Sequence, residues 1–116
     1  MAITLTPDVL RAAYDYLSAC RPFSEWNLPD SDDIVFKVAK CPRHYGWYDI
    51  AHGRHMIFIS RRCVTSGNCL LSTMAHEMLH LHQNLSGMES NDDHNQAFIK
   101  LAAQICRVHG FDLKSF

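Results

Sequence analysis

Residues 69–80 read Cys69-Leu70-Leu71-Ser72-Thr73-Met74-Ala75-His76-Glu77-Met78-Leu79-His80. The apolar side chains of this stretch recur every three or four residues and continue to Leu85, which predicts an amphipathic helix that closes near residues 84–87. His76 and His80 are one turn apart, so both imidazoles leave the same face of that helix. Two imidazoles placed in this way can share a metal ion, and zinc favours such nitrogen ligands.

Glu77 follows the first of these histidines, about 100° further round the same helix. From there it can hydrogen-bond a water molecule instead of ligating the metal. Its carboxylate can take a proton from that water as the water attacks a carbonyl, and can then pass the proton to the leaving amine. The spacing therefore predicts a zinc peptidase site, with His76 and His80 as metal ligands and Glu77 as the general base.

A catalytic zinc takes three protein ligands and keeps one position open. The candidates for the third ligand are His82, Glu89, Asp92, Asp93, His94 and His109. His82 lies about 200° round the helix from His80 and faces away, and His109 is about four turns beyond His94. The loop 84–93 can bring His94 back over the motif. We predict His94 as the third ligand, with Glu89 as the alternative.

The rest of the chain predicts one helix, three strands and two helices. Thr6-Pro7-Asp8 is a helix start, with Thr6 as the N-cap, and the helix runs to about Cys20. Three short strands are expected at 34–39, 46–50 and 55–60, joined by turn-like segments at 41–45 and 51–54. An antiparallel meander, in which each strand pairs with the next, is the economical arrangement.

The last helix follows the polar loop 89–93 and is expected to carry His94 in its first turn. Asp92 or Asp93 is predicted to be its N-cap, and Gly110 marks its end. Phe98, one turn after His94, should anchor this helix in the core and hold the imidazole in place. The fold class is thus α+β: a minimal zincin-like domain with an N-terminal helix, a three-stranded antiparallel sheet, an active-site helix and a C-terminal helix.

Composition bounds the remaining possibilities. The chain has 116 residues, 47% of them apolar, which suits a single domain covering residues 1–116 with one core. Five cysteines without a C-x-x-C pair predict reduced thiols instead of a disulfide framework. No signal peptide and no apolar run long enough to cross a membrane are visible. A cytoplasmic monomer without membrane contact is expected.

Charge is uneven although the net charge is only −1. The segment 37–62 carries six Lys and Arg residues against the single acid Asp49, with aromatic residues interleaved. Charge and stacking together are what single-stranded nucleic acid binds to, so a DNA contact through this segment stays open beside an ordinary mixed surface. Tyr45, Trp47 and Tyr48 are expected to pack in the sheet and core, and His44 to lie exposed in a turn.

The motif stretch, together with His94-Asn95-Gln96-Ala97-Phe98, resembles the SprT-like (Spartan) zinc peptidases, whose pattern is a helical H-E-x-x-H, an insert and then H-G-x-x-F. The segments Gly46-Trp47-Tyr48 and 57–60 are similar to that family's strands. The resemblance spans about residues 8–110 and implies a bare protease domain that binds Zn²⁺ through His76, His80 and His94. It also implies action on DNA-associated proteins. Asn95 stands where the family has glycine.

Three functions follow from these patterns. The first is a zinc-dependent endopeptidase that hydrolyses a protein or peptide substrate. The second is a zinc-stabilised module that binds protein or DNA without cleaving it. The third is a regulatory peptidase of the ImmA/IrrE type, whose pattern places an acidic ligand differently. The identity of the third ligand separates the first function from the third.

Overall fold

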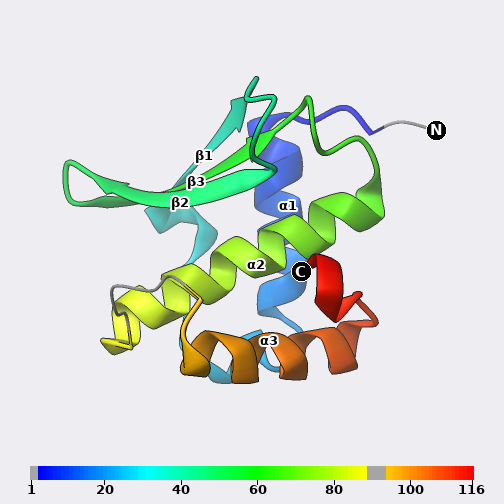
Figure 1. Cartoon of the computed structure of the whole chain (residues 1–116). Helices are drawn as coiled ribbons and strands as arrows, with labels where there is room; N and C mark the ends of the chain where they lie inside the picture. The colour runs from blue at the N-terminus through cyan, green and yellow to red at the C-terminus, as the bar shows by residue number, and fades with distance from the viewer. Residues whose placement is uncertain (1–2, 89–93) are drawn as a thin grey trace.

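The structure is a computed structural model that describes residues 3–88 and 94–116. Three helices lie on one side of a three-stranded sheet (Figure 1): α1 (Pro7–Ser18), α2 (Gly67–Ser86) and α3 (Gln96–His109). Helices α1 and α2 contact the sheet, and α3 packs on α2. The strands are β1 (Ile34–Ala39), β2 (Gly46–Ala51) and β3 (Arg54–Ser60). The predicted α+β class and the three strand segments are confirmed, each to within one residue at its ends.

Helix α2 is the central element, because it contacts α1, α3 and the sheet. Its N-cap is Ser66, whose hydroxyl accepts a hydrogen bond from the backbone N–H of Cys69 at 3.1 Å. It ends at Gly87, which has the left-handed backbone conformation that glycine adopts without strain. Helix α1 begins at the predicted cap, where the Thr6 hydroxyl accepts from Val9 N–H at 3.2 Å.

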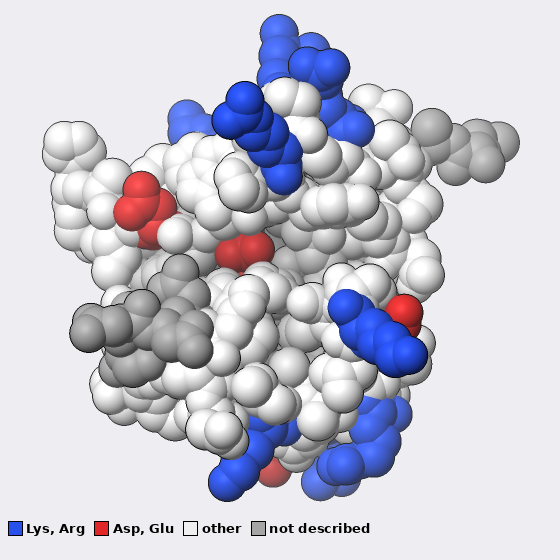
Figure 2. All heavy atoms as spheres, in the orientation of Figure 1, with Lys and Arg blue, Asp and Glu red and all other residues white. Residues whose placement is uncertain are grey.

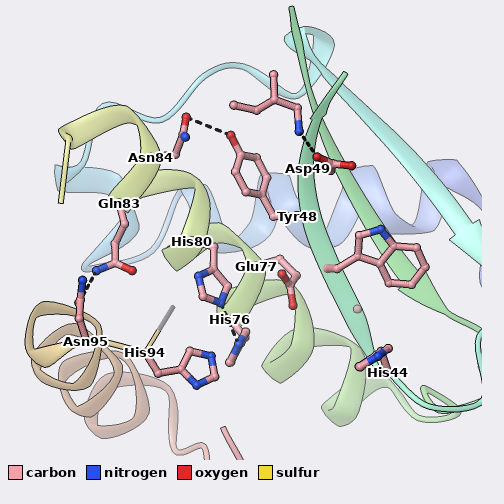
Figure 3. Close-up of a pocket in the computed structure, with 13 residues that line it drawn as sticks. His44, Tyr48, Asp49, His76, Glu77, His80, Gln83, Asn84, His94 and Asn95 are labelled. Carbon is pink, nitrogen blue, oxygen red and sulfur yellow. Dashed lines mark hydrogen bonds between the residues drawn. The ribbon is translucent and has the colours of Figure 1, made fainter. Parts of the chain in front are cut away.

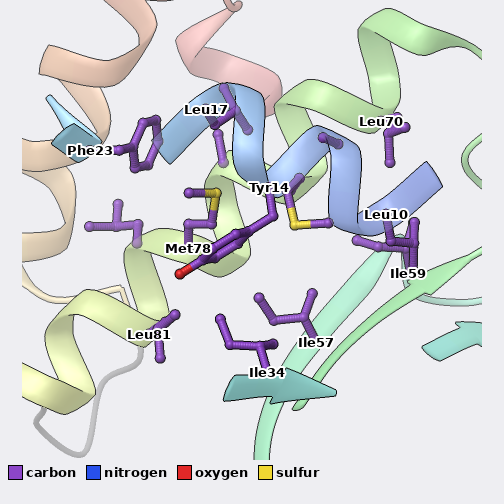
Figure 4. Packing of buried hydrophobic residues seen from close by; sticks show 14 of the residues in the cluster. Leu10, Tyr14, Leu17, Phe23, Ile34, Ile57, Ile59, Leu70, Met78 and Leu81 are labelled. Carbon is purple, nitrogen blue, oxygen red and sulfur yellow. The ribbon is translucent and has the colours of Figure 1, made fainter. Parts of the chain in front are cut away.

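The core is one cluster between the sheet and the helices (Figure 4). Tyr14 and Leu17 of α1, Ile57 and Ile59 of β3, and Met78 of α2 are all at most 1% exposed. The Tyr14 hydroxyl donates to the carbonyl of Pro29 at 2.6 Å and so ties the loop 22–33 to α1. Two sequence predictions of burial fail: Leu85 is 47% exposed and Tyr45 is 56% exposed.

The strand order is β1-β3-β2, so the predicted antiparallel meander is wrong. Strand β3 lies in the middle, where it pairs with β1 in parallel and with β2 antiparallel. The turn at 51–54 does form the predicted hairpin, with His52 and Gly53 both at positive φ. The segment 41–45, however, carries the chain past the position of β3. The central place suits β3 because its side chains Ile57 and Ile59 are fully buried.

Helix α3 also starts later than expected. Its N-cap is Asn95, whose side chain accepts from Phe98 N–H at 2.9 Å, so the prediction of Asp92 or Asp93 as cap is wrong. His94 therefore lies just before the helix and not in its first turn. Gly110 ends α3 in a left-handed conformation, as predicted. Within the described residues, no helix has both the length and the apolar character needed to cross a bilayer.

Candidate metal centre

His76 and His80 leave α2 on the side that faces α3, as their spacing predicted (Figure 3). Their Nε2 atoms are 3.2 Å apart. Two nitrogen ligands of one tetrahedral zinc ion are expected to lie about 3.3 Å apart, from metal–nitrogen distances of about 2.0–2.1 Å. The two imidazoles already have the separation that a shared metal requires.

His94 joins the pair from the chain segment before α3. Its ligand atom and those of His76 and His80 all lie within 4.8 Å of one another, although His94 itself is exposed. Among the described residues, this is the cluster of three metal-binding side chains that the fold brings together. An all-imidazole donor set suits zinc.

The ring of Phe98 contacts all three imidazoles. Its ring centroid lies 4.5 Å from that of His94, 4.8 Å from that of His80 and 5.1 Å from that of His76. Phe98 is 4% exposed, so the core holds it firmly. The predicted role of Phe98 as an anchor beside His94 is confirmed, and the contact extends to the other two histidines.

Asn95 joins the segment before α3 to the helix that carries the motif. Its side-chain oxygen accepts from Gln83 Nε2 at 3.0 Å, and its amide nitrogen donates to the Met88 carbonyl at 2.9 Å. Its φ of −73° lies in the ordinary region, so this position needs no glycine. Because Asn95 also caps α3, one side chain holds His94 in register with α2.

The remaining candidate ligands divide into two groups. His82 faces away from the cluster, as predicted, and its ring stacks on Trp26 at 4.1 Å between centroids. The Nε2 atom of His109 is hydrogen-bonded to the carbonyl of Arg21 at 2.7 Å. Neither belongs to the cluster. Glu89, Asp92 and Asp93 lie outside the described residues.

Burial makes His76 a neutral imidazole at physiological pH. The pKa of His76 is lowered to about 4, mainly by desolvation and also by the nearby His80 and His94. A hydrogen bond to the backbone of Phe116 partly offsets this lowering. Metal ligation needs the neutral form of histidine. The side chain is therefore in the binding form without having to release a proton near pH 7.

Glu77 points into the space between α2 and β2 (Figure 3) and is only 4% exposed. Burial raises the pKa of its carboxyl to about 8. A cation held by the neighbouring histidines would favour the ionised form, since an opposite charge at close range stabilises a carboxylate. Burial therefore favours the protonated form of Glu77, and a bound cation would favour the ionised form that a general base needs.

Two clefts meet at His76 and Glu77. The first, of about 620 Å³, runs between β2 and the second half of α2, and the second, of about 790 Å³, runs between the loop before β2 and the first half of α2. His44 and Gly46 also line both. Figure 2 shows the resulting hollow across the face of the molecule, with acidic atoms in its floor.

The edge of β2 borders the first cleft. Residues 46–50 all line it although their side chains alternate in direction, so the cleft follows the backbone edge of the strand. Tyr45 accepts a hydrogen bond from Ser60 N–H on the β3 side at 2.8 Å. By alternation, the backbone groups of Gly46 and Ile50 point away from β3, toward the cleft. The Ile50 N–H donates to the Asp49 carboxylate at 2.8 Å, so Ile50 presents its carbonyl there.

Two nearby residues acquire a place that the sequence did not predict. His44 is exposed, as expected, but lines both clefts. Phe116 lies with its ring 5.3 Å from that of His76. No periodicity or motif connects either residue to the H-E-x-x-H helix, so the sequence carried no signal for them.

Tyr48 also lies beside the first cleft. Its hydroxyl is hydrogen-bonded to His55 at 2.6 Å and to Asn84 at 3.3 Å.

No family model matches the chain, and no curated protein matches it. The resemblance to SprT-like peptidases accordingly rests on the sequence segments that carry it.

Proposed function

We propose that this protein is a zinc-dependent endopeptidase of the SprT-like kind, with His76, His80 and His94 as metal ligands and Glu77 as the general base. The observation that carries the proposal is the convergence of three imidazoles, two from α2 and one from the segment before α3, within 4.8 Å and beside a buried glutamate. A histidine and not an acid as third ligand favours this kind over the ImmA/IrrE type.

The donor set fits zinc because it consists of three imidazole nitrogens, which bind the metal in their neutral form. A fourth coordination position, on the side that faces the clefts, would be open to a substrate. Bound zinc would supply Lewis acidity toward the substrate carbonyl and toward a water molecule. Glu77 accepts one proton from the attacking water as the water oxygen bonds to the carbonyl carbon. It then passes this proton to the amine as the carbon–nitrogen bond breaks.

The substrate strand is expected to lie along the outer edge of β2. Gly46 directs its N–H and carbonyl, and Ile50 its carbonyl, into the first cleft. An exposed strand edge binds an extended peptide through such backbone groups. Such pairing reads the substrate backbone and needs no particular sequence. It would place the scissile carbonyl over His76 and Glu77, where the two clefts meet.

The proposal is tested with metal analysis and casein cleavage on wild type, Glu77→Gln and His94→Ala. We expect one zinc per wild-type chain, the same zinc content with cleavage reduced at least 100-fold in Glu77→Gln, and reduced zinc content in His94→Ala. Equal cleavage by wild type and Glu77→Gln would remove Glu77 as the base. A zinc-loaded wild type that cleaves nothing, and is indifferent to Glu77→Gln, would favour the binding module.

A second activity, contact with single-stranded DNA, is favoured by the outer face of the sheet. Lys37, Phe58 and Trp47 form one cross-strand row on the face opposite the buried Ile57 and Ile59. The Trp47 and Phe58 rings stack at 4.7 Å between centroids with an interplanar angle of 11°. An exposed lysine beside a stacked aromatic pair can bind a base and a phosphate together.

Basic side chains extend this face at one end of the sheet. Lys40, Arg43, Arg61 and Arg62 are exposed there, and Figure 2 shows blue atoms gathered at the top of the molecule, over the end of the sheet. Anisotropy of a labelled oligothymidine should show weaker binding for Lys37→Ala and Arg61→Ala, with Lys100→Ala on α3 as the control. Equal affinity for all four proteins would argue against this DNA surface.

A further inference from the structure

The second cleft has a wall that the peptidase motif does not contribute. One side is the face of α2 with Thr73, His76 and Glu77, and another is the loop that leads into β2. The third side is the segment after α3, residues 110–116, from which Phe111 and Phe116 line the cleft. A stretch distant in sequence therefore lies beside the reacting centre.

This segment is an ordered part of the fold. The Gly110 N–H donates to the Cys106 carbonyl at 2.8 Å, which fastens the segment to the end of α3. Asp112 then closes a short 3-10 turn (Leu113–Ser115), accepting from Lys114 N–H at 3.1 Å and, through its carbonyl, from Ser115 N–H at 3.2 Å. The wall is thus held by backbone hydrogen bonds at both its beginning and its turn.

The two phenylalanines give the wall an apolar surface. Their rings lie nearly parallel, with centroids 6.2 Å apart and an interplanar angle of 17°. Both are partly buried against the core, so each presents only one side to the cleft. Phe116 also contacts His76, with ring centroids 5.3 Å apart. A substrate side chain next to the scissile bond would meet this surface.

The order of residues along β2 indicates which substrate residue that is. Ile50 and Asp49 line only the first cleft, Gly46 lines both, and Tyr45 lines only the second. A peptide paired antiparallel to β2, the more stable pairing, runs from the Ile50 end to the Gly46 end. Its residues after the scissile bond then enter the second cleft.

We propose that Phe111 and Phe116 form a specificity pocket for a large apolar side chain on the substrate residue that follows the cleaved bond. The inference rests on the proposed peptidase function and names the substrate preference of that same site. The physical basis is burial of the substrate side chain against two rings that are already fixed in place, which favours larger apolar groups by about tenfold or more over a methyl group.

The first measurement is cleavage of two peptides that differ only at the residue after the cleaved bond, leucine or alanine. Wild type should show kcat/KM at least tenfold higher for the leucine peptide. Phe116→Ala and Phe111→Ala should each reduce that ratio toward one. Leu113→Ala is the matched control, because Leu113 belongs to the same segment but is 51% exposed and does not line the cleft. The ratio is unaffected by a uniform loss of activity.

The second measurement needs no turnover. Calorimetry of the zinc-loaded proteins uses two small hydroxamates, which chelate zinc, bearing an isobutyl or a methyl group. Wild type and Leu113→Ala should bind the isobutyl compound at least tenfold more tightly, and Phe116→Ala should lose this difference. Phe116→Leu, which keeps much of the apolar volume, should retain part of it.

The outcomes separate the two proposals. If no peptide is cleaved but the isobutyl preference is present and depends on Phe116, the pocket stands and the peptidase function fails. If peptides are cleaved but Phe116→Ala and Phe111→Ala keep the wild-type ratio, the pocket is overturned and the peptidase stands. A preference confined to the residue before the cleaved bond would also overturn it.

Discussion

Gly46 lies where β2 approaches α2, at the junction of the two clefts. A Cβ atom added there would meet the Phe58 carbonyl oxygen at 2.8 Å and the Thr73 Cγ2 atom at 3.1 Å. The first of these contacts is with backbone, which cannot move aside without shifting the strand. The absence of a side chain at this position thus sets the spacing between the strand edge and the helix that carries His76 and Glu77.

Gly46→Ala is expected to lower the free energy of unfolding by about 1–3 kcal/mol, because the added methyl group overpacks a tight contact. Chemical denaturation measures this change. Gly67→Ala is the matched control, since a Cβ atom at Gly67 has nothing within 4 Å and should leave stability nearly unchanged. A Gly46→Ala protein as stable as wild type would mean that β2 moves freely relative to α2.

Tyr14 makes the stability of the fold depend on pH in the alkaline range. Desolvation raises the pKa of its buried hydroxyl, and the Ser18 side chain offsets only part of this increase. Because the pKa of Tyr14 is higher in the folded state than in the unfolded state, the unfolded state loses this proton first as the pH rises. The contribution to stability is therefore complete below about pH 10 and decreases above it. Wild type should therefore lose more stability than Tyr14→Phe between pH 9 and pH 11, as followed by circular dichroism.

Tyr14→Phe itself should cost about 1 kcal/mol at pH 7, since it removes the hydrogen bond to the Pro29 carbonyl. Tyr16→Phe is the control, because Tyr16 lies on the same helix but is 56% exposed. Equal alkaline slopes for wild type and Tyr14→Phe would contradict the role assigned to the buried hydroxyl.

Helices α2 and α3 meet through Asn95, the N-cap of α3, and through the ring of Phe98. Ser66 caps α2 at the end remote from His94, whereas Asn95 caps α3 directly beside it. Asn95 alone of these two also bonds to Gln83 of the neighbouring helix. The two caps contribute similarly to helix stability but differently to the position of the third imidazole.

Ser66→Ala should lower the free energy of unfolding by about 1 kcal/mol. Asn95→Ala should lower it by about 2–3 kcal/mol, because it also removes the bonds to Gln83 and to the Met88 carbonyl. Only Asn95→Ala should also weaken zinc binding, by roughly 10-fold, because outer-shell partners orient the ligands of a metal. Competition with a chelating dye measures the zinc affinity of both. Equal zinc affinity of the two variants would show that His94 is positioned without Asn95.

For the whole molecule, a metal ion held by the three imidazoles would link α2 to the segment before α3. A ligand that binds only the folded state stabilises it, by about 2.7 kcal/mol at a concentration 100 times its Kd. Zinc at that excess should raise the thermal midpoint of wild type, and a chelator should reverse the shift. Glu77→Gln should keep this response and His94→Ala should lose most of it.

A thermal midpoint that zinc leaves unchanged in wild type would contradict the metal centre. A response retained in full by His94→Ala would show that another side chain completes the ligand set.

The parts of this protein that follow from sequence are local. The helix from residue 69 to about residues 84–87, and the pairing of His76 with His80 on one of its faces, follow from repeats within one or two turns, which covalent geometry determines. The hairpin at 51–54 follows in the same way from a two-residue turn that suits glycine. These features depend on neighbours in the chain and hardly on the rest of the fold.

Tertiary structure decided the features that join distant segments. Six residues between β1 and β2 are long enough either for a hairpin or for a step past another strand, and burial of Ile57 and Ile59 selected the central place for β3. His94 was predictable as a residue type, but the bonds of Asn95 to α2 put it beside the motif. Phe116 reached His76 only through the turn after Gly110, because contacts between distant segments depend on how the whole core packs.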